Sequence, residues 1–189
     1  MLNPAICRYP CSTLNELPED IQAMIIEVQE KTGFIPHVFL TLARRPNEFR
    51  AFFDYYQAIM TREANLSLAE KEMIIVTTSA ANGCQYCVVA HGAVLRIVSK
   101  DPLLSDQLST NHRHAAITER QKAILDFSLK LCRAPEEICQ QDYEALYMQG
   151  LTDEDIWDIS SVCAFFGLSN RMAVISAMQP NVEFYTMGR

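Results

Sequence analysis

The sequence has little positive charge and contains no run of basic residues. Its 16 lysine and arginine residues are outnumbered by 23 acidic residues, which gives a formal net charge of -7 at pH 7. An acidic surface repels nucleic-acid phosphates and anionic lipid head groups. We therefore expect no nucleic acid and no membrane among the partners of this protein.

The features of an exported, disulfide-stabilised protein are also missing. The first ten residues lack the charged and then apolar order of a secretory signal. The 7 cysteines are an odd number, and their spacing suggests no disulfide framework. Thiols stay reduced in the cytosol, so we expect a cytoplasmic protein.

Signals for β-strands are nearly absent, because no alternating apolar and polar run is bounded by hairpin turns. Capping boxes that start helices are present instead, at Ser67 with Glu70 and at Thr118 with Gln121. Hydrophobic residues make up 49% of the chain, which suffices for a core without disulfides or metals. These observations predict an all-α helical bundle that forms a single domain over residues 1–189.

The expected helices follow from capping residues, prolines and apolar periodicity. We expect helices to begin near residues 14, 46, 67, 84, 118, 135 and 152. The last of them is expected to run toward Gly167, and residues 99–114 are expected to form a long loop.

One uncharged stretch is long enough to cross a bilayer, because no charged residue occurs from Met73 to Leu95. Polar residues are scattered through it, and Asn82-Gly83 interrupts its middle. Such a pattern favours two consecutive helices buried in protein over a membrane span.

The second of these helices carries Cys84, Cys87 and His91, whose spacing of three and then four places them on one helical face. At the start of a helix, free N–H groups and the helix dipole favour a thiolate over a thiol. His91 is one turn from Cys87 and can accept a proton. Glu72 on the preceding helix can orient the imidazole if the two helices pack antiparallel. Thiol, base and orienting group together describe an activated nucleophile.

This constellation predicts a short redox reaction that needs no cofactor. The Cys87 thiolate attacks a hydroperoxide, which leaves a sulfenic acid on Cys87 and releases an alcohol or water. Cys84 then condenses with the sulfenic acid to form a disulfide. An external dithiol restores the pair by exchange.

Other interpretations of the same residues stay open. Cys84, Cys87, His91 and Glu72 could ligate zinc, although no second CxxC or histidine pair completes a structural metal site, so we expect no metal. The cysteines could also pack as small hydrophobic residues, or serve as a thiol redox switch without turnover. Haem attachment is excluded because Val88, not histidine, follows the second cysteine.

A weak internal repeat accompanies these features, because residues 66–88 align without gaps on residues 151–173. Each copy begins with leucine and a hydroxyl residue, followed after two further residues by an acid. An apolar stretch then leads to a break, at Gly83 in the first copy and near Gly167 in the second. Ser169 and Met172 stand where the first copy has its two cysteines. The repeat predicts a helical hairpin in each copy.

The pattern Glu72, Cys84-Gln-Tyr-Cys87 and Ala90-His91 resembles the AhpD-like alkylhydroperoxidases of the carboxymuconolactone decarboxylase superfamily. Agreement with the peroxidase-related branch extends over residues 34–179, at segments 33–36, 118–123, 133–135, 150–156 and 165–171.

The resemblance implies an all-α fold of paired helical hairpins that assembles into a trimer or hexamer. It also implies a peroxidase in which Cys87 attacks, Cys84 resolves, and His91 and Glu72 relay protons. The reductant implied is a dithiol, such as a lipoylated protein. The best-known members have a second histidine between the two cysteines, whereas Tyr86 occupies that position here, so the relay is one member shorter.

Overall fold

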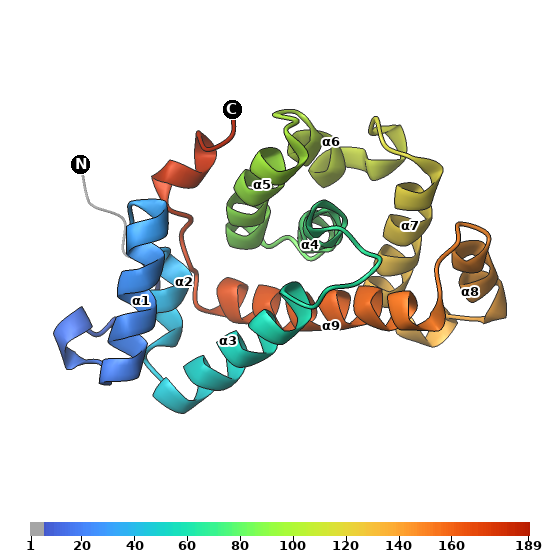
Figure 1. Cartoon of the computed structure of the whole chain (residues 1–189). Coiled ribbons are helices and arrows are strands. Elements are labelled where there is room, and N and C mark those ends of the chain that lie inside the picture. Colours follow the sequence, from blue (N-terminus) through green and yellow to red (C-terminus); the bar gives the residue numbers. More distant parts are fainter. Residues whose placement is uncertain (1–5) are drawn as a thin grey trace.

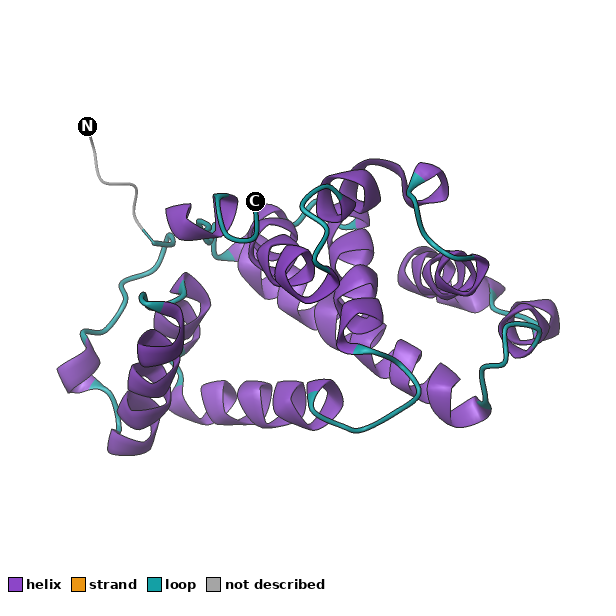
Figure 2. Cartoon of the chain, turned by 45° about the horizontal axis from the view of Figure 1, so that its top comes forward, coloured by secondary structure: helices purple, strands orange, loops and turns teal. Residues whose placement is uncertain are grey.

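The structure, a computed structural model, describes residues 6–189, and helices are its only regular elements in that range. Figure 2 shows these helices joined by loops, with no strand drawn in the described part of the chain. The α-helices are α1 (Glu19–Thr32), α2 (His37–Leu42), α3 (Pro46–Met60), α4 (Leu68–Ala81), α5 (Gln85–Ser99), α6 (Leu104–Asn111), α7 (Glu119–Arg133), α8 (Gln140–Tyr147) and α9 (Asp153–Ile175). The expected all-α class is confirmed.

Helix α4 is the centre of the fold. Figure 1 views it along its axis, with α5, α6, α7 and α9 arranged around it and in contact with it. All of its residues from 70 to 79 are buried. A helix surrounded by protein needs apolar or satisfied polar groups on every side, which explains the long uncharged stretch that begins at Met73.

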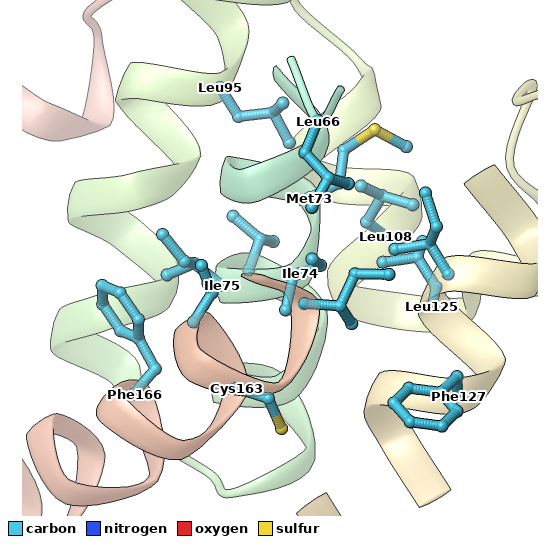
Figure 3. Packing of buried hydrophobic residues seen from close by; sticks show 14 of the residues in the cluster. Leu66, Met73, Ile74, Ile75, Leu95, Leu108, Leu125, Phe127, Cys163 and Phe166 are labelled. Carbon is cyan, nitrogen blue, oxygen red and sulfur yellow. The ribbon is translucent and has the colours of Figure 1, made fainter. Parts of the chain in front are cut away.

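The main core fills the space between α4 and its neighbours. Figure 3 shows aliphatic side chains of α4 packed against α5, α6, α7 and α9. Ten residues of this core are labelled in the figure: Leu66, Met73, Ile74, Ile75, Leu95, Leu108, Leu125, Phe127, Cys163 and Phe166. A separate apolar cluster joins α1, α2 and the start of α3 at one end of the molecule.

A buried lysine connects α3 to α4. Lys71 is 2% exposed, and its ammonium group donates hydrogen bonds to the carbonyls of Ile59 at 2.9 Å, Met60 at 3.2 Å and Arg62 at 3.0 Å. The last carbonyls of a helix have no partner within the helix and carry negative partial charge. Lys71 therefore caps the carboxyl end of α3 and fixes it beside α4.

The start signals read from the sequence are confirmed where they are specific. Ser67 with Glu70 caps α4, and Thr118 with Gln121 caps α7, each as a reciprocal capping box. The uncharged stretch is divided between α4 and α5, and in residues 6–189 no helix combines the length and the apolar character needed to cross a membrane.

Four expectations about element boundaries are wrong. Residues 99–114 are largely helical, because α6 and a 3₁₀ turn occupy most of them. Helix α9 does not break near Gly167 but continues to Ile175, since buried residues on both sides of the glycine hold the helix together. The helix expected from residue 14 is split at Pro18, and the one expected from Pro135 begins as a 3₁₀ turn.

Candidate active site

The turn between α4 and α5 places the two cysteines at a helix start. Asn82 ends α4, and Gly83 has a φ of 65°, a left-handed conformation that suits glycine. Cys84 is the N-cap of α5, and its backbone N–H donates to the carbonyl of Ser79 at 2.9 Å. Cys87 follows in the first turn, where backbone N–H groups lack helical partners.

Glu72 and His91 meet at the interface of α4 and α5. The Nδ1 of His91 lies 2.8 Å from the Oε2 of Glu72, and their side chains are 16% and 1% exposed. A carboxylate at Nδ1 holds the proton on that nitrogen and leaves Nε2 as the acceptor. Phe166 of α9 packs its edge against the imidazole with ring centroids 4.7 Å apart. The approach expected from the sequence is therefore present in the structure.

Both cysteines are almost fully covered. Cys84 is 1% exposed and Cys87 is 2% exposed, within an apolar cluster that includes Ala173, Met178 and Phe184. Phe184 lies in the 3₁₀ segment Val182–Tyr185, which packs against α5 and contributes to the same apolar cluster as the cysteines.

The two thiols have opposite proton affinities. The neighbouring Cys87 thiol, helped by the Cys87 backbone N–H and the Asn170 amide, lowers the pKa of Cys84 to about 7, although burial opposes the shift. The charge of His91 acts in the same direction. The interaction with Cys84, together with burial, raises the pKa of Cys87. These shifts favour the thiolate on Cys84 over the thiolate on Cys87.

Two residues of α9 complete the surroundings of the thiols. The hydroxyl of Ser169 lies 3.8 Å from the Cys87 sulfur. The amide of Asn170 donates to Ser79 at 2.9 Å and accepts from Asn82 at 2.9 Å, and it favours the charged form of both cysteines. Neither residue was identified as a site residue from the sequence. The internal repeat was the available signal, because it aligned Ser169 with Cys84.

Tyr86, the residue between the cysteines, serves a structural contact. Its hydroxyl oxygen accepts a hydrogen bond from the backbone N–H of Val38 in α2 at 3.1 Å. Burial raises the pKa of Tyr86 above its ordinary value. Tyr86 thus stays protonated and ties α5 to α2, rather than replacing a histidine in a proton relay.

A cavity of about 600 Å³ reaches the same group of amides. Asn82 and Asn170 line it, together with Arg8, Arg171 and an apolar wall from the end of α9. Asn170, which affects the pKa of both thiols, thus forms part of the wall of this cavity, beside two positive charges.

The structure gives no support to the zinc interpretation. Within residues 6–189, no three histidine, cysteine or acidic side chains are grouped so that they could hold a metal ion. The carboxylate of Glu72 is instead bonded to His91.

The family is shown by comparison with known proteins. Residues 46–129 match the model of the carboxymuconolactone decarboxylase family. A crystal structure from Ralstonia eutropha JMP134, described as an alkylhydroperoxidase AhpD core and uncharacterized peroxidase-related protein, is 57% identical with a TM-score of 0.97, covering 98% of both chains. A peroxidase-related protein from Silicibacter sp. TM1040 is 39% identical with a TM-score of 0.94, covering 100% of this chain and 99% of its own. The curated proteins include no match.

The fold also occurs with a different described activity. The debrominase Bmp8 in its apo form has a TM-score of 0.79 at 17% identity, covering 99% of this chain and 97% of its own. This likeness concerns the fold alone, and a shared fold does not determine the reaction. The two closer matches cover nearly the whole chain, and the chain therefore belongs to the AhpD-like, peroxidase-related proteins of the carboxymuconolactone decarboxylase superfamily.

Proposed function

We propose that this protein is a thiol-dependent peroxidase that reduces hydroperoxides with the Cys84–Cys87 pair. The observation that carries the proposal is the 2.8 Å contact between Glu72 and His91 beside a dithiol at the start of a helix. An oriented base close to a dithiol at a helix start is the arrangement that activates a sulfur nucleophile.

In the proposed reaction Cys87 attacks the terminal oxygen of the hydroperoxide. The O–O bond breaks, the sulfur gains the OH group as a sulfenic acid, and the alkoxide takes a proton to leave as an alcohol. Cys84 then attacks the Cys87 sulfur, and the sulfenic OH leaves as water. Counted from the fully protonated dithiol, its two protons end in the alcohol and the water, and the sulfur pair ends as a disulfide.

The resting charge on Cys84 sets the order of the proton transfers. Cys87 becomes a nucleophile when its proton passes to the neighbouring Cys84 thiolate, and the higher proton affinity of Cys87 makes it the stronger nucleophile once deprotonated. Cys84 must lose that proton again before it resolves the sulfenic acid. His91 in its neutral form is the proposed acceptor, and Glu72 stabilises the imidazolium that forms.

The surroundings of the site are consistent with a small organic hydroperoxide that approaches through the 600 Å³ cavity. We further propose that a dithiol, such as a lipoylated protein in the cytoplasm, reduces the disulfide. The enzyme is proposed to act as a homo-oligomer, a trimer or hexamer.

A thiol redox switch is the second candidate, and the burial of both sulfurs favours it. Exposures of 1% and 2% allow a single oxidation event but slow the access of a bulky reductant. The switch predicts stoichiometric oxidation of the pair without continued turnover.

Turnover with a dithiol separates the two candidates. The assay follows loss of cumene hydroperoxide in the presence of dihydrolipoamide and catalytic amounts of protein. The peroxidase proposal predicts many reduced hydroperoxides per subunit, and it predicts no activity in Cys87→Ser. Consumption that stops after about one hydroperoxide per dithiol supports the switch instead.

A further inference from the structure

Two further cysteines lie together between α7 and α9. Cys163 of α9 is buried in the main core, where Figure 3 labels it, and Cys132 of α7 is half-buried at the edge of that core. The Cys163 thiol donates to the carbonyl of Ser128 at 3.4 Å. In an α-helix this carbonyl also accepts the amide proton of the residue four positions later, which is Cys132. The Cys163 sulfur therefore lies beside the Cys132 backbone, and the two thiols interact.

The two thiols differ in exposure and in proton affinity. The Cys163 thiol, and beyond it the charges of Arg133 and Arg171, lower the pKa of Cys132 to about 6 against the effect of burial. The interaction with Cys132, together with burial, raises the pKa of Cys163. At neutral pH the more exposed sulfur is thus the thiolate, and the buried sulfur keeps its proton.

A shared amide and a shared cavity connect this pair to the Cys84–Cys87 pair. The Cys132 thiol donates to the side-chain oxygen of Asn82 at 3.4 Å, and Asn82 in turn donates to Asn170 at 2.9 Å. Both asparagines line the 600 Å³ cavity, as does Arg171. A molecule in this cavity therefore lies next to a hydrogen-bond partner of each cysteine pair.

From this arrangement we propose that Cys132 and Cys163 form a second oxidisable dithiol, served by the same cavity as the first. The oxidant is a hydroperoxide. The Cys132 thiolate attacks its terminal oxygen, the O–O bond breaks, and the alkoxide leaves and takes a proton from water. Cys163 attacks the sulfenic sulfur and forms the Cys132–Cys163 disulfide, and its proton leaves with the sulfenic OH group as water. Counted from the Cys132 thiolate, the net products are one disulfide, one alcohol and one hydroxide, because the alkoxide takes its proton from water.

The test uses the full chain carrying Cys84→Ser and Cys87→Ser, so that the first pair cannot take part. The reduced protein is treated with one equivalent of cumene hydroperoxide, the remaining thiols are alkylated, and peptides are identified by mass spectrometry. The expected product joins the peptides of Cys132 and Cys163 by a disulfide. Cys139 serves as the internal comparison, because it is exposed. Cys132 is expected to react about tenfold faster than Cys139, owing to its thiolate character.

A matched variant tests the resolving role. With Cys163→Ala in the same background, Cys132 is expected to remain a sulfenic acid that dimedone labels. If that variant does not fold, the cross-linked peptide in the parent protein still decides the question. Oxidation of Cys132 no faster than that of Cys139, or oxidation without linkage to Cys163, overturns the proposal. Since the first pair is absent from this assay, either result is independent of the peroxidase proposal.

The peptide map also distinguishes a disulfide in the remaining close pair of cysteines. The sulfurs of Cys7 and Cys11 are 3.7 Å apart and can also form a disulfide, which would appear as a cross-link within residues 7–11. Formation of that cross-link in place of the Cys132–Cys163 link also contradicts the proposal.

Discussion

The bond between Glu72 and His91 gives a quantitative prediction about catalysis. Glu72→Gln keeps the size of the side chain but removes its charge, in a position where the carboxylate is 1% exposed and 2.8 Å from the imidazole. A hydrogen bond to a charged group contributes about 1.5–3 kcal/mol. If the carboxylate stabilises the charged imidazole by this amount in the transition state, losing it lowers kcat/KM for hydroperoxide by about 10- to 100-fold. Each factor of ten corresponds to about 1.4 kcal/mol.

Glu70 provides a matched control on the same helix. It is also a buried carboxylate, 8% exposed, but it pairs with Arg120 at 3.0 Å and caps the start of α4. Glu70→Gln is expected to reduce the free energy of unfolding while leaving kcat/KM near the wild-type value in the folded protein.

The assay is the pH dependence of kcat/KM for cumene hydroperoxide, accompanied by thermal unfolding of each variant. In Glu72→Gln the number of thiols that react with a disulfide reagent should remain unchanged, because both cysteines are still present. Equal losses of kcat/KM in the Glu72 and Glu70 variants would refute the reasoning, since they would show that the effect arises from helix stability and not from the imidazole.

Three further predictions concern the thiols, the cover of the site and the fold. The ultraviolet absorbance of thiolate, measured in a Cys132→Ser background so that Cys132 does not contribute, should rise with a midpoint near the Cys84 pKa of about 7. Adding Cys84→Ser should remove that step, and a step that persists would show that another group titrates there. Phe184→Ala should raise the rate at which the reduced Cys84–Cys87 pair is alkylated about tenfold, because it uncovers the pair, whereas the control Tyr185→Phe should leave the rate unchanged. Equal rates in the two variants would show that the C-terminal segment does not limit access. Lys71→Met should lower the free energy of unfolding by about 3 kcal/mol in urea titrations, because three carbonyls lose their hydrogen-bond donor. A loss below about 1 kcal/mol would show that water replaces the ammonium group as donor.

Local rules predicted the parts of the fold that depend on neighbours in sequence. The capping boxes at Ser67 and Thr118 start α4 and α7 because their hydrogen bonds close within three residues. The Asn82-Gly83 turn was equally predictable, because glycine adopts the left-handed conformation that this turn requires. The contact between Glu72 and His91 needed one assumption beyond these rules, that the two helices pack against each other.

The parts that could not be predicted depend on packing. The sequence does not show that α9 continues through Gly167, because burial of neighbouring residues compensates for the low helix propensity of glycine. As a consequence, the place of Asn170 beside the cysteines could not be derived from residue spacing. The different proton affinities of Cys84 and Cys87 arise first from the interaction between the two thiols and from burial, and the burial depends on how the helices pack.

The packing of Cys132 close to Cys163 could not be predicted from the sequence either. Cys163 is buried in the core and Cys132 is half-buried at its edge. Their interaction arises because α7 and α9 pack side by side. This packing brings together two residues that lie 31 positions apart in the sequence. Long-range contacts of this kind carry no local signal.

The most direct test of the catalytic account is a single turnover of the reduced wild-type protein. One equivalent of cumene hydroperoxide is added, the reaction is quenched with an alkylating reagent, and each cysteine peptide is quantified. The account predicts that the Cys84–Cys87 disulfide is the first product and that Cys84→Ser leaves a sulfenic acid on Cys87. If the pair stays reduced while other cysteines oxidise, the account is contradicted.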